Sequence, residues 1–196
     1  MRIARVRHAA QISYARLGEE GAHLLDRAPW RGGTETGATV RAYDIDVPVE
    51  PSKIICVGRN YAAHARELGH DIPVAPLLFL KPPSALMAHE GLIAHPPESQ
   101  RVDFEGEIGV VIGSRGRHID AAHAARHVFG ITCANDVTAR DLQMADVQFT
   151  RAKGFDSFCP IGPRVVAELD PRGLAITSRV NGELRRLSPE PLRPNT

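Results

Sequence analysis

The sequence predicts an α+β fold, built on a mixed, curled β-sheet with few, short helices. Short runs of apolar or alternating residues recur along the 196-residue chain, and Gly, Pro and Thr separate them, as is typical of strands and turns. Stretches with helical character are fewer and brief, and they do not alternate regularly with the strands. This pattern argues against a doubly wound parallel sheet.

The first 50 residues are expected to form a small β-rich N-terminal domain. Short strands are predicted at 2–7, 12–17 and 40–48, where apolar residues recur between turn formers. The segment GGTETGATV (32–40) is expected to be a loop, because glycine and threonine dominate it.

Residues 51–196 are expected to form the main domain. It opens with a four-residue apolar run ending in Gly58, which predicts a buried strand. The pair Asn181-Gly182 predicts a hairpin turn, and the last residues, LSPEPLRPNT, are expected to be a frayed tail. Further strands are predicted at 77–81, 101–113 and 131–136, and helices at 61–69, 120–130 and 138–146.

Charge and composition argue against several classes of protein. A formal net charge of +1 gives no electrostatic reason to expect nucleic acid or an anionic membrane as a partner. No stretch approaches the roughly 18 consecutive apolar residues that a membrane-spanning helix needs, and the N-terminus lacks a secretory apolar core. A cytoplasmic location is therefore expected. The three cysteines are widely spaced and odd in number, which predicts neither a disulfide framework nor a zinc site.

The acidic stretch RVDFEGEIGVVIG (101–113) raises the main chemical question. Asp103, Glu105 and Glu107 alternate, so in an extended strand they project from one face, about 6–7 Å apart. Like charges this close require solvent exposure, raised pKa values or a shared cation. Asp136, where the apolar run ITCAND ends, is placed to complete a three-carboxylate site. The residues alone leave a solvated face and a Mg²⁺ site both open.

Lysine is the rarer cation in this chain. Arginines outnumber lysines by 21 to 3, and the three lysines are Lys53, Lys81 and Lys153. Where arginine is the default, a retained lysine indicates a place that needs a compact, titratable ammonium.

Five segments, in this order and spacing, resemble the fumarylacetoacetate hydrolase family, in particular its small prokaryotic members. The resemblance covers residues 50 to 185, and residues 1–50 resemble the short N-terminal domain that some members carry. It implies the curled β-roll of that family's C-terminal domain. The segments are KIICVGRNYAAHARELG, LLFLKPPSAL, VDFEGEIGVVIG, CANDVTARDLQ and TRAKGFDSFCPIGP.

The resemblance implies roles for particular acids. Glu105 and Glu107 match the E-x-E metal ligands and Asp136 the third carboxylate, so Mg²⁺ is expected, with Mn²⁺ or Ca²⁺ as alternatives. Asp103 is then a solvated or ion-paired neighbour. Lys153 matches a lysine near the metal, where an ammonium would stabilise charge developing on an enolate. A salt bridge to one of the carboxylates is the alternative role.

A second group of residues is expected around the substrate. His64 and Glu67 lie three apart on a predicted helix and match a His-Glu pair that activates water; a surface histidine beside a surface glutamate is the alternative. For Arg140, the alternative to substrate binding is an ion pair with Asp141 at a helix start. The expected substrate-binding residues are Arg59, Asn60, Tyr61, Lys81, Arg140 and Gln143.

These features predict a Mg²⁺-dependent enzyme acting on a small oxo acid. Hydrolysis of a C–C bond in an acylpyruvate-like compound is the leading hypothesis. Isomerisation of the 2-hydroxyhepta-2,4-diene-1,7-dioate type and decarboxylation of related oxo-dicarboxylic acids use the same enolate-stabilising groups. A catalytically incomplete metal-binding remnant and a scaffold domain are the non-enzymatic alternatives. The resemblance also implies a homodimer.

The C-terminus departs from the family pattern. Relatives continue for several dozen residues beyond RVNGELRR, so the main domain is expected to be truncated at its C-terminus. Such a truncation is expected to leave sheet edges and apolar residues uncovered.

Overall fold

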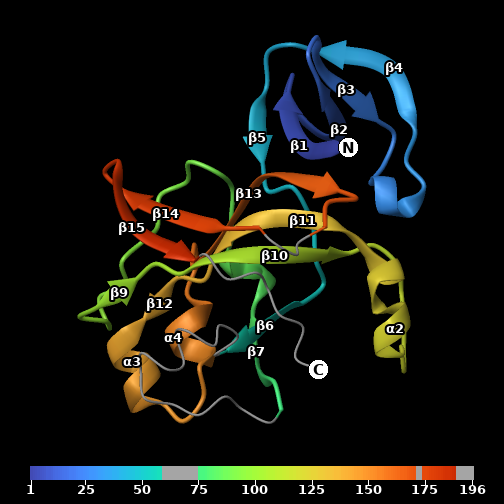
Figure 1. Ribbon diagram of the computed structural model, residues 1–196. Coiled ribbons are helices and arrows are strands. Elements are labelled where there is room, and N and C mark those ends of the chain that lie inside the picture. The colour runs from blue at the N-terminus through green and yellow to red at the C-terminus, as the bar shows by residue number, and fades with distance from the viewer. Residues whose placement is uncertain (59–74, 171–173, 189–196) are drawn as a thin grey trace.

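The computed structural model describes residues 1–58, 75–170 and 174–188. Over these residues the predicted α+β class is confirmed, because strands dominate and the helices are few and short (Figure 1). None of the described helices is long and apolar enough to cross a membrane. The strands are β1 (Arg2–His8), β2 (Gln11–Gly18), β3 (Gly21–Leu25), β4 (Glu35–Val40), β5 (Asp44–Asp46), β6 (Ile54–Gly58), β7 (Leu77–Lys81), β8 (Leu86–Met87), β9 (Val102–Asp103), β10 (Gly106–Ile112), β11 (Val128–Asn135), β12 (Thr138–Ala139), β13 (Cys159–Ala167), β14 (Ile176–Val180) and β15 (Glu183–Ser188). The helical segments are η1 (Pro29–Arg31), η2 (Pro83–Ala85), α2 (Ala121–Ala124), η3 (Ala125–His127), α3 (Arg140–Ala145) and α4 (Thr150–Gly154).

One large sheet organises the described chain. Its strand order is β10-β11-β13-β1-β2-β3-β4, with β5 added on β1 and β8 on β13. The sheet is mixed, as predicted, since β8 and β13 run parallel whereas the other pairs are antiparallel. The N-terminal strands join it through β1 and β13, where Arg2 faces Val166 and Ile3 faces Val165. The first 46 residues therefore extend the same sheet as the main segment (Figure 1).

The acidic stretch does not form the single strand that its alternation predicts. β9 pairs with β12, whereas β10 pairs with β11, and the chain leaves the extended ladder at Phe104 and Glu105 between them. On the face opposite the acids, Phe104 is 41% exposed and Val110 is 50% exposed. The break has a functional consequence, since it turns Glu105 toward the segment that follows β11.

Several other predicted elements differ in type or length. The predicted loop at 32–40 contains β4, which pairs with β3. The predicted helix at 120–130 is shorter, because Val128 already begins β11. The helix predicted to begin near Thr138 starts at Arg140, because Thr138 pairs with Asp103 in β12. α4 and β13 come from a stretch for which the pattern predicts no element.

The predicted C-terminal hairpin is confirmed as β14 and β15. Asn181 and Gly182 form its turn with φ angles of 53° and 81°, the left-handed conformation that two-residue hairpin turns require. The helix predicted at 61–69 and residues 189–196 of the predicted tail lie outside the described residues.

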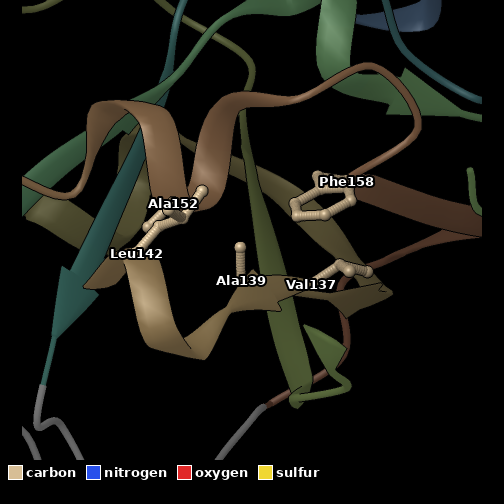
Figure 2. Close-up of a cluster of buried hydrophobic side chains, with 5 residues drawn as sticks. All are labelled: Val137, Ala139, Leu142, Ala152 and Phe158. Carbon is tan, nitrogen blue, oxygen red and sulfur yellow. The ribbon is translucent and has the colours of Figure 1, made fainter. Parts of the chain in front are cut away.

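A compact apolar cluster joins α3 and α4 to β12 and the residue before β13. Figure 2 shows side chains from α3, α4, β12 and the segments that precede β12 and β13, which meet in this cluster. Val102 and Phe155 pack against it from its margins. A second cluster lies between the N-terminal strands, around Val6 and Ala15. The cluster of Figure 2 consists of Val137, Ala139, Leu142, Ala152 and Phe158.

The antiparallel pair of strands β6 and β7 buries only one of its faces. The strand at β6 is predicted correctly, but it is not buried on both sides. In the observed register Ile55 pairs with Leu80 and Val57 with Leu78, and these four side chains are 43–61% exposed. The alternate positions turn inward, and among them Lys81 is 2% exposed. Strand alternation thus places Lys81 inside the protein.

Candidate functional site

The ammonium of Lys153 is the centre of the most concentrated charge cluster among the described residues. Its Nζ donates to Glu105 Oε2 at 2.9 Å, Asp136 Oδ2 at 2.7 Å and Thr138 Oγ1 at 2.9 Å. Lys153 is 3% exposed, and its Nζ lies 4.9 Å from the centre of the Phe79 ring. All three N–H groups of this buried cation are therefore satisfied, two of them by carboxylates.

Backbone hydrogen bonds bring the two carboxylates together. The Asp136 amide donates to the Glu105 carbonyl at 2.8 Å, and the Glu105 amide donates to Asn135 Oδ1 at 2.9 Å. These bonds join the break between β9 and β10 to the end of β11. Thr138 adds to the arrangement, because its hydroxyl donates to the Asp136 carbonyl while accepting from Lys153.

The core cluster of Figure 2 holds the backbone on which these polar groups stand. Val137 and Ala139 flank Thr138, and Ala152 precedes Lys153 in α4. Neighbours along a strand point to opposite faces, so burial of Val137 and Ala139 directs Thr138 the other way. Apolar packing on one side therefore presents the polar groups on the other.

Asp136 has one oxygen that no hydrogen bond reaches. Its Oδ2 accepts from Lys153, whereas Oδ1 is buried and accepts no hydrogen bond. The Lys81 ammonium lies only 2.8 Å from Oδ1, yet its N–H groups are directed at the carbonyls of Val137, Lys153 and Phe158. Lys81 thus neutralises Asp136 by charge and leaves an acceptor lone pair unused.

A second ion-pair network supports Glu105 from the outer side. Arg140 donates to Glu105 Oε1 at 2.7 Å, Asp103 Oδ2 at 2.9 Å and Gln143 Oε1 at 2.6 Å. Arg101 pairs with Asp103 at 3.0 Å, so the ion-paired interpretation of Asp103 is confirmed. Arg140 pairs with Asp103 and Glu105, and not with Asp141 as the alternative interpretation holds.

These contacts shift the pKa values of the acids downward. Burial would raise the pKa of Glu105, but the charge of Lys153 and the hydrogen bonds from Lys153 and Arg140 outweigh it and lower that pKa. The hydrogen bond from Arg101, assisted by Arg140, lowers the pKa of Asp103. Burial would lower the pKa of Arg140, and its bonds to Glu105 and Asp103 reverse this, so that its pKa is raised. These shifts favour the charged forms of Asp103, Glu105 and Arg140.

Asp141 has a separate, structural set of partners. The Ser99 hydroxyl donates to one of its oxygens at 2.6 Å, and the Gln100 amide donates to the other at 2.9 Å. The Ser99 bond, followed by the Gln100 bond, lowers the pKa of Asp141 to about 2. Asp141 thereby ties the first turn of α3 to the loop that leads into β9.

Oxygen donors suited to a hard divalent cation are present in this cluster. Glu105 and Asp136 converge on the Lys153 ammonium, and the Lys81 ammonium lies 2.8 Å from the other oxygen of Asp136. Glu107, the third expected ligand, lies on β10 opposite Ala134 and is half-buried. Among the described residues, no group of three or more His, Cys, Asp or Glu side chains is arranged to hold a metal ion. Carboxylate oxygens are of the type that a hard cation binds, and both metal binding and the identity of the ion stay predictions.

The remaining predicted site residues divide into two groups. Gln143 and Arg140 contact each other at the edge of the cluster, and Lys81 is buried beneath it with every N–H directed to a backbone carbonyl. The others lie outside the described residues, and they are Arg59, Asn60, Tyr61, His64 and Glu67.

The predicted set omits two contributors to the cluster, Thr138 and Phe79. Thr138 lies two positions after Asp136, and Phe79 lies two positions before Lys81 on β7. Because alternate residues of a strand share a face, this spacing was a usable signal.

All three cysteines are free, as expected; burial raises the pKa of Cys56 to about 12 and that of Cys159 to about 11, whereas Cys133 is exposed.

Comparison with protein families gives two matches that together cover most of the chain. Residues 53–189 match the family described as fumarylacetoacetate (FAA) hydrolase C-terminal. Residues 1–47 match the family described as Rv2993c-like, N-terminal.

Curated relatives show the same similarity over the main segment. The chain is 52% identical over 140 residues to the protein MJ1656 of Methanocaldococcus jannaschii, which covers 71% of this chain and 59% of that protein. It is 48% identical over 143 residues to the mitochondrial oxaloacetate tautomerase FAHD2B of Bos taurus, covering 70% of this chain and 46% of the tautomerase. The chain therefore spans about half of the length of these relatives.

Solved structures match almost the whole chain, each over 96% of its length. A 5-carboxymethyl-2-hydroxymuconate delta-isomerase from Mycobacterium smegmatis superposes with a TM-score of 0.88 at 35% identity, covering 75% of that chain. A 2-hydroxyhepta-2,4-diene-1,7-dioate isomerase from Mycobacterium marinum gives 0.85 at 34% identity, covering 74%. A fumarylacetoacetate hydrolase from Exiguobacterium antarcticum gives 0.81 at 32% identity, covering 75%.

Proposed function

The chain belongs to the fumarylacetoacetate hydrolase family, and from this premise we propose that it isomerises a small 2-oxo acid between keto and enol forms. The isomerase and tautomerase names of its relatives support this choice of reaction. The proposal thus prefers isomerisation to C–C hydrolysis, which is the leading hypothesis from the sequence alone. Both reactions pass through an enolate, so they share the demand for positive charge beside the oxo oxygen.

The observation that carries the proposal is the buried ammonium of Lys153. It is held by Glu105, Asp136 and Thr138 at 2.7–2.9 Å and is almost completely excluded from water. A fixed cation in such surroundings interacts more strongly with developing negative charge than it would in water. An enolate formed beside Lys153 would be stabilised by its charge, and to accept a hydrogen bond from it the enolate oxygen would replace Glu105, Asp136 or Thr138 as one of its three acceptors.

Other residues of the chain provide binding and proton transfer in this proposal. Arg140 and Gln143 at the edge of the cluster are suited to bind a substrate carboxylate. Arg140 would do so by giving up one of its hydrogen bonds to Gln143 or Glu105. His64 and Glu67 are the proposed acid-base pair that carries the proton between the substrate carbon and its oxo oxygen. A divalent cation held by Glu105, Glu107 and Asp136 would, when bound, supply Lewis-acid polarisation of the oxo oxygen. Mg²⁺ is the proposed ion, with Mn²⁺ or Ca²⁺ as alternatives.

C–C hydrolysis of an acylpyruvate-like acid is the second candidate function. The hydrolase from Exiguobacterium antarcticum supports it, with a TM-score of 0.81 over nearly the whole chain. Hydrolysis needs water activated next to the enolate-stabilising groups, a role that falls to His64 and Glu67 in this proposal. A homodimer and a cytoplasmic location complete the proposal.

A substrate panel tests the proposed reaction. The full chain is assayed with oxaloacetate, acylpyruvates and unsaturated 2-hydroxy dicarboxylic acids, with chelator and with each of the three cations. We expect accelerated decay of the enol absorbance, lost in Glu105→Gln and kept in the exposed control Glu98→Gln. Release of pyruvate would favour hydrolysis, and release of carbon dioxide would favour decarboxylation. Cation binding without turnover of any acid would refute an enzymatic function and favour a metal-binding remnant.

A further inference from the structure

Lys81 is among the largest fully buried side chains of the described residues, and it is a charged one. It is 2% exposed, at the inner end of β7. A buried ammonium is strongly unfavourable unless each N–H finds an acceptor. Here the acceptors are the carbonyl oxygens of Val137 at 3.1 Å, Lys153 at 2.6 Å and Phe158 at 2.8 Å. No N–H of Lys81 is left to contact a substrate.

The three carbonyls belong to the segments that carry the site. Val137 directly follows Asp136, and Lys153 accepts through its own backbone while its side chain binds Asp136. These acceptors lie 56 and 72 residues from Lys81 in the sequence. One ammonium therefore joins the backbones of both partners in the Lys153–Asp136 pair.

The bond to the Lys153 carbonyl also completes a very short helix. α4 has five residues, which is too few for a helix to be stable by itself, and its last carbonyls lack partners within the helix. A cation at the C-terminal end of a helix is favourable for the same reason. Lys81 supplies a donor there, so it sets the position from which the Lys153 side chain extends.

We propose that Lys81 is a positioning residue, which holds Asp136 and Lys153 where their side chains meet and does not itself touch substrate. Its importance for turnover depends on the proposed function, whereas its effect on the geometry of Lys153 does not. The proposal differs from the substrate-binding role that the family resemblance implies for Lys81.

The scarcity of lysine makes a direct test practical. Side-chain ¹H–¹⁵N spectra of the full chain should show two ammonium signals protected from exchange, from Lys81 and Lys153, because Lys53 is exposed. In Lys81→Met, one signal disappears and we expect the Lys153 signal to shift or to broaden through faster exchange. The control Val6→Ala removes apolar atoms from the second cluster, between the N-terminal strands, and should leave the Lys153 signal in place.

Kinetics and a second variant distinguish positioning from the other roles of a buried lysine. In the panel above, Lys81→Met should lower kcat about 100-fold with KM nearly unchanged, because misplacement of a catalytic group affects the chemical step. A substrate-binding role would instead raise KM. Lys81→Arg keeps the charge but cannot donate from a single nitrogen to all three carbonyls, so it should not restore kcat. It also serves in the same tests if Lys81→Met fails to fold.

Two outcomes would overturn the proposal, and neither depends on the reaction. An unchanged Lys153 signal in a folded Lys81 variant would show that Lys81 does not position Lys153. An equal change of that signal in Val6→Ala would show only general loss of packing. Absence of turnover in the wild-type protein would refute the proposed function and leave the spectra to decide the role of Lys81.

Discussion

Replacement of Lys153 by methionine removes the charge around which the site is built and keeps most of the side-chain volume. The substitution leaves Glu105 Oε2, Asp136 Oδ2 and the Thr138 hydroxyl without the donor they share. Each carboxylate keeps a second cation, since Arg140 lies 2.7 Å from Glu105 and Lys81 lies 2.8 Å from Asp136. The site is thus weakened and not emptied of positive charge.

The expected magnitudes follow from burial and from these remaining partners. Removing one member of a buried ion pair costs about 3–5 kcal/mol of unfolding free energy, because the other member is left uncompensated. The second cations at Glu105 and Asp136 place Lys153→Met at the lower end, about 3 kcal/mol. Loss of one fixed charge beside a developing enolate should lower kcat by about 100- to 1,000-fold.

Urea unfolding and turnover measure the two effects separately. The only tryptophan, Trp30, packs against Tyr14 and Phe129 and therefore reports on unfolding of the large sheet. Lys53→Met is the matched control, because Lys53 is exposed and the same substitution there should change the unfolding free energy by less than about 0.5 kcal/mol. If Lys153→Met matched this control in stability and in kcat, the central role assigned to its ammonium would be refuted.

Three further predictions concern acid stability, the core and the hairpin. The Ser99 bond holds the folded-state pKa of Asp141 at about 2, below the ordinary 3.8. The stabilisation from the ionised Asp141 is therefore fully present above the ordinary pKa and is lost as the pH falls through about 2. Asp141→Asn should make the unfolding free energy fall less steeply between about pH 4 and about pH 2. Urea titrations across that range measure the slope, and equal slopes in both proteins would contradict the assignment. Leu142→Ala deletes a side chain that is 8% exposed and should cost about 3 kcal/mol in the same titration at neutral pH; a cost below about 1 kcal/mol would mean that the cluster refills the space. Gly182→Ala places a β-carbon at a φ of 81°, which costs about 1 kcal/mol. Amide hydrogen exchange across β14 and β15 should therefore be about fivefold faster. An unchanged exchange rate would argue against this turn geometry.

The sequence predicted strands best where one face is apolar or the turn is specific. β1, β2, β7 and the hairpin at Asn181-Gly182 all have such signals. β4 was missed because nearly all of its side chains are exposed, so it has no apolar alternation, and it is a strand only through pairing with β3. The break at Glu105 was missed for a related reason, since β9 and β10 have different partners and no local pattern records which partner each one finds.

By itself, the sequence determined which residue types meet in the site and the family to which the chain belongs. The alternating acids, Asp136 at the end of an apolar run and the two lysines kept in an arginine-rich chain are all visible in the order of residues. Only the tertiary structure decided that Lys153 bridges Glu105 and Asp136 and that Lys81 binds backbone carbonyls beneath them. The acceptors lie 15 to 77 residues from the lysines that bind them, and such distant groups meet only when the sheet and the core cluster have formed. Burial then assigns the roles, because an ammonium without water must use every N–H on the nearest oxygens.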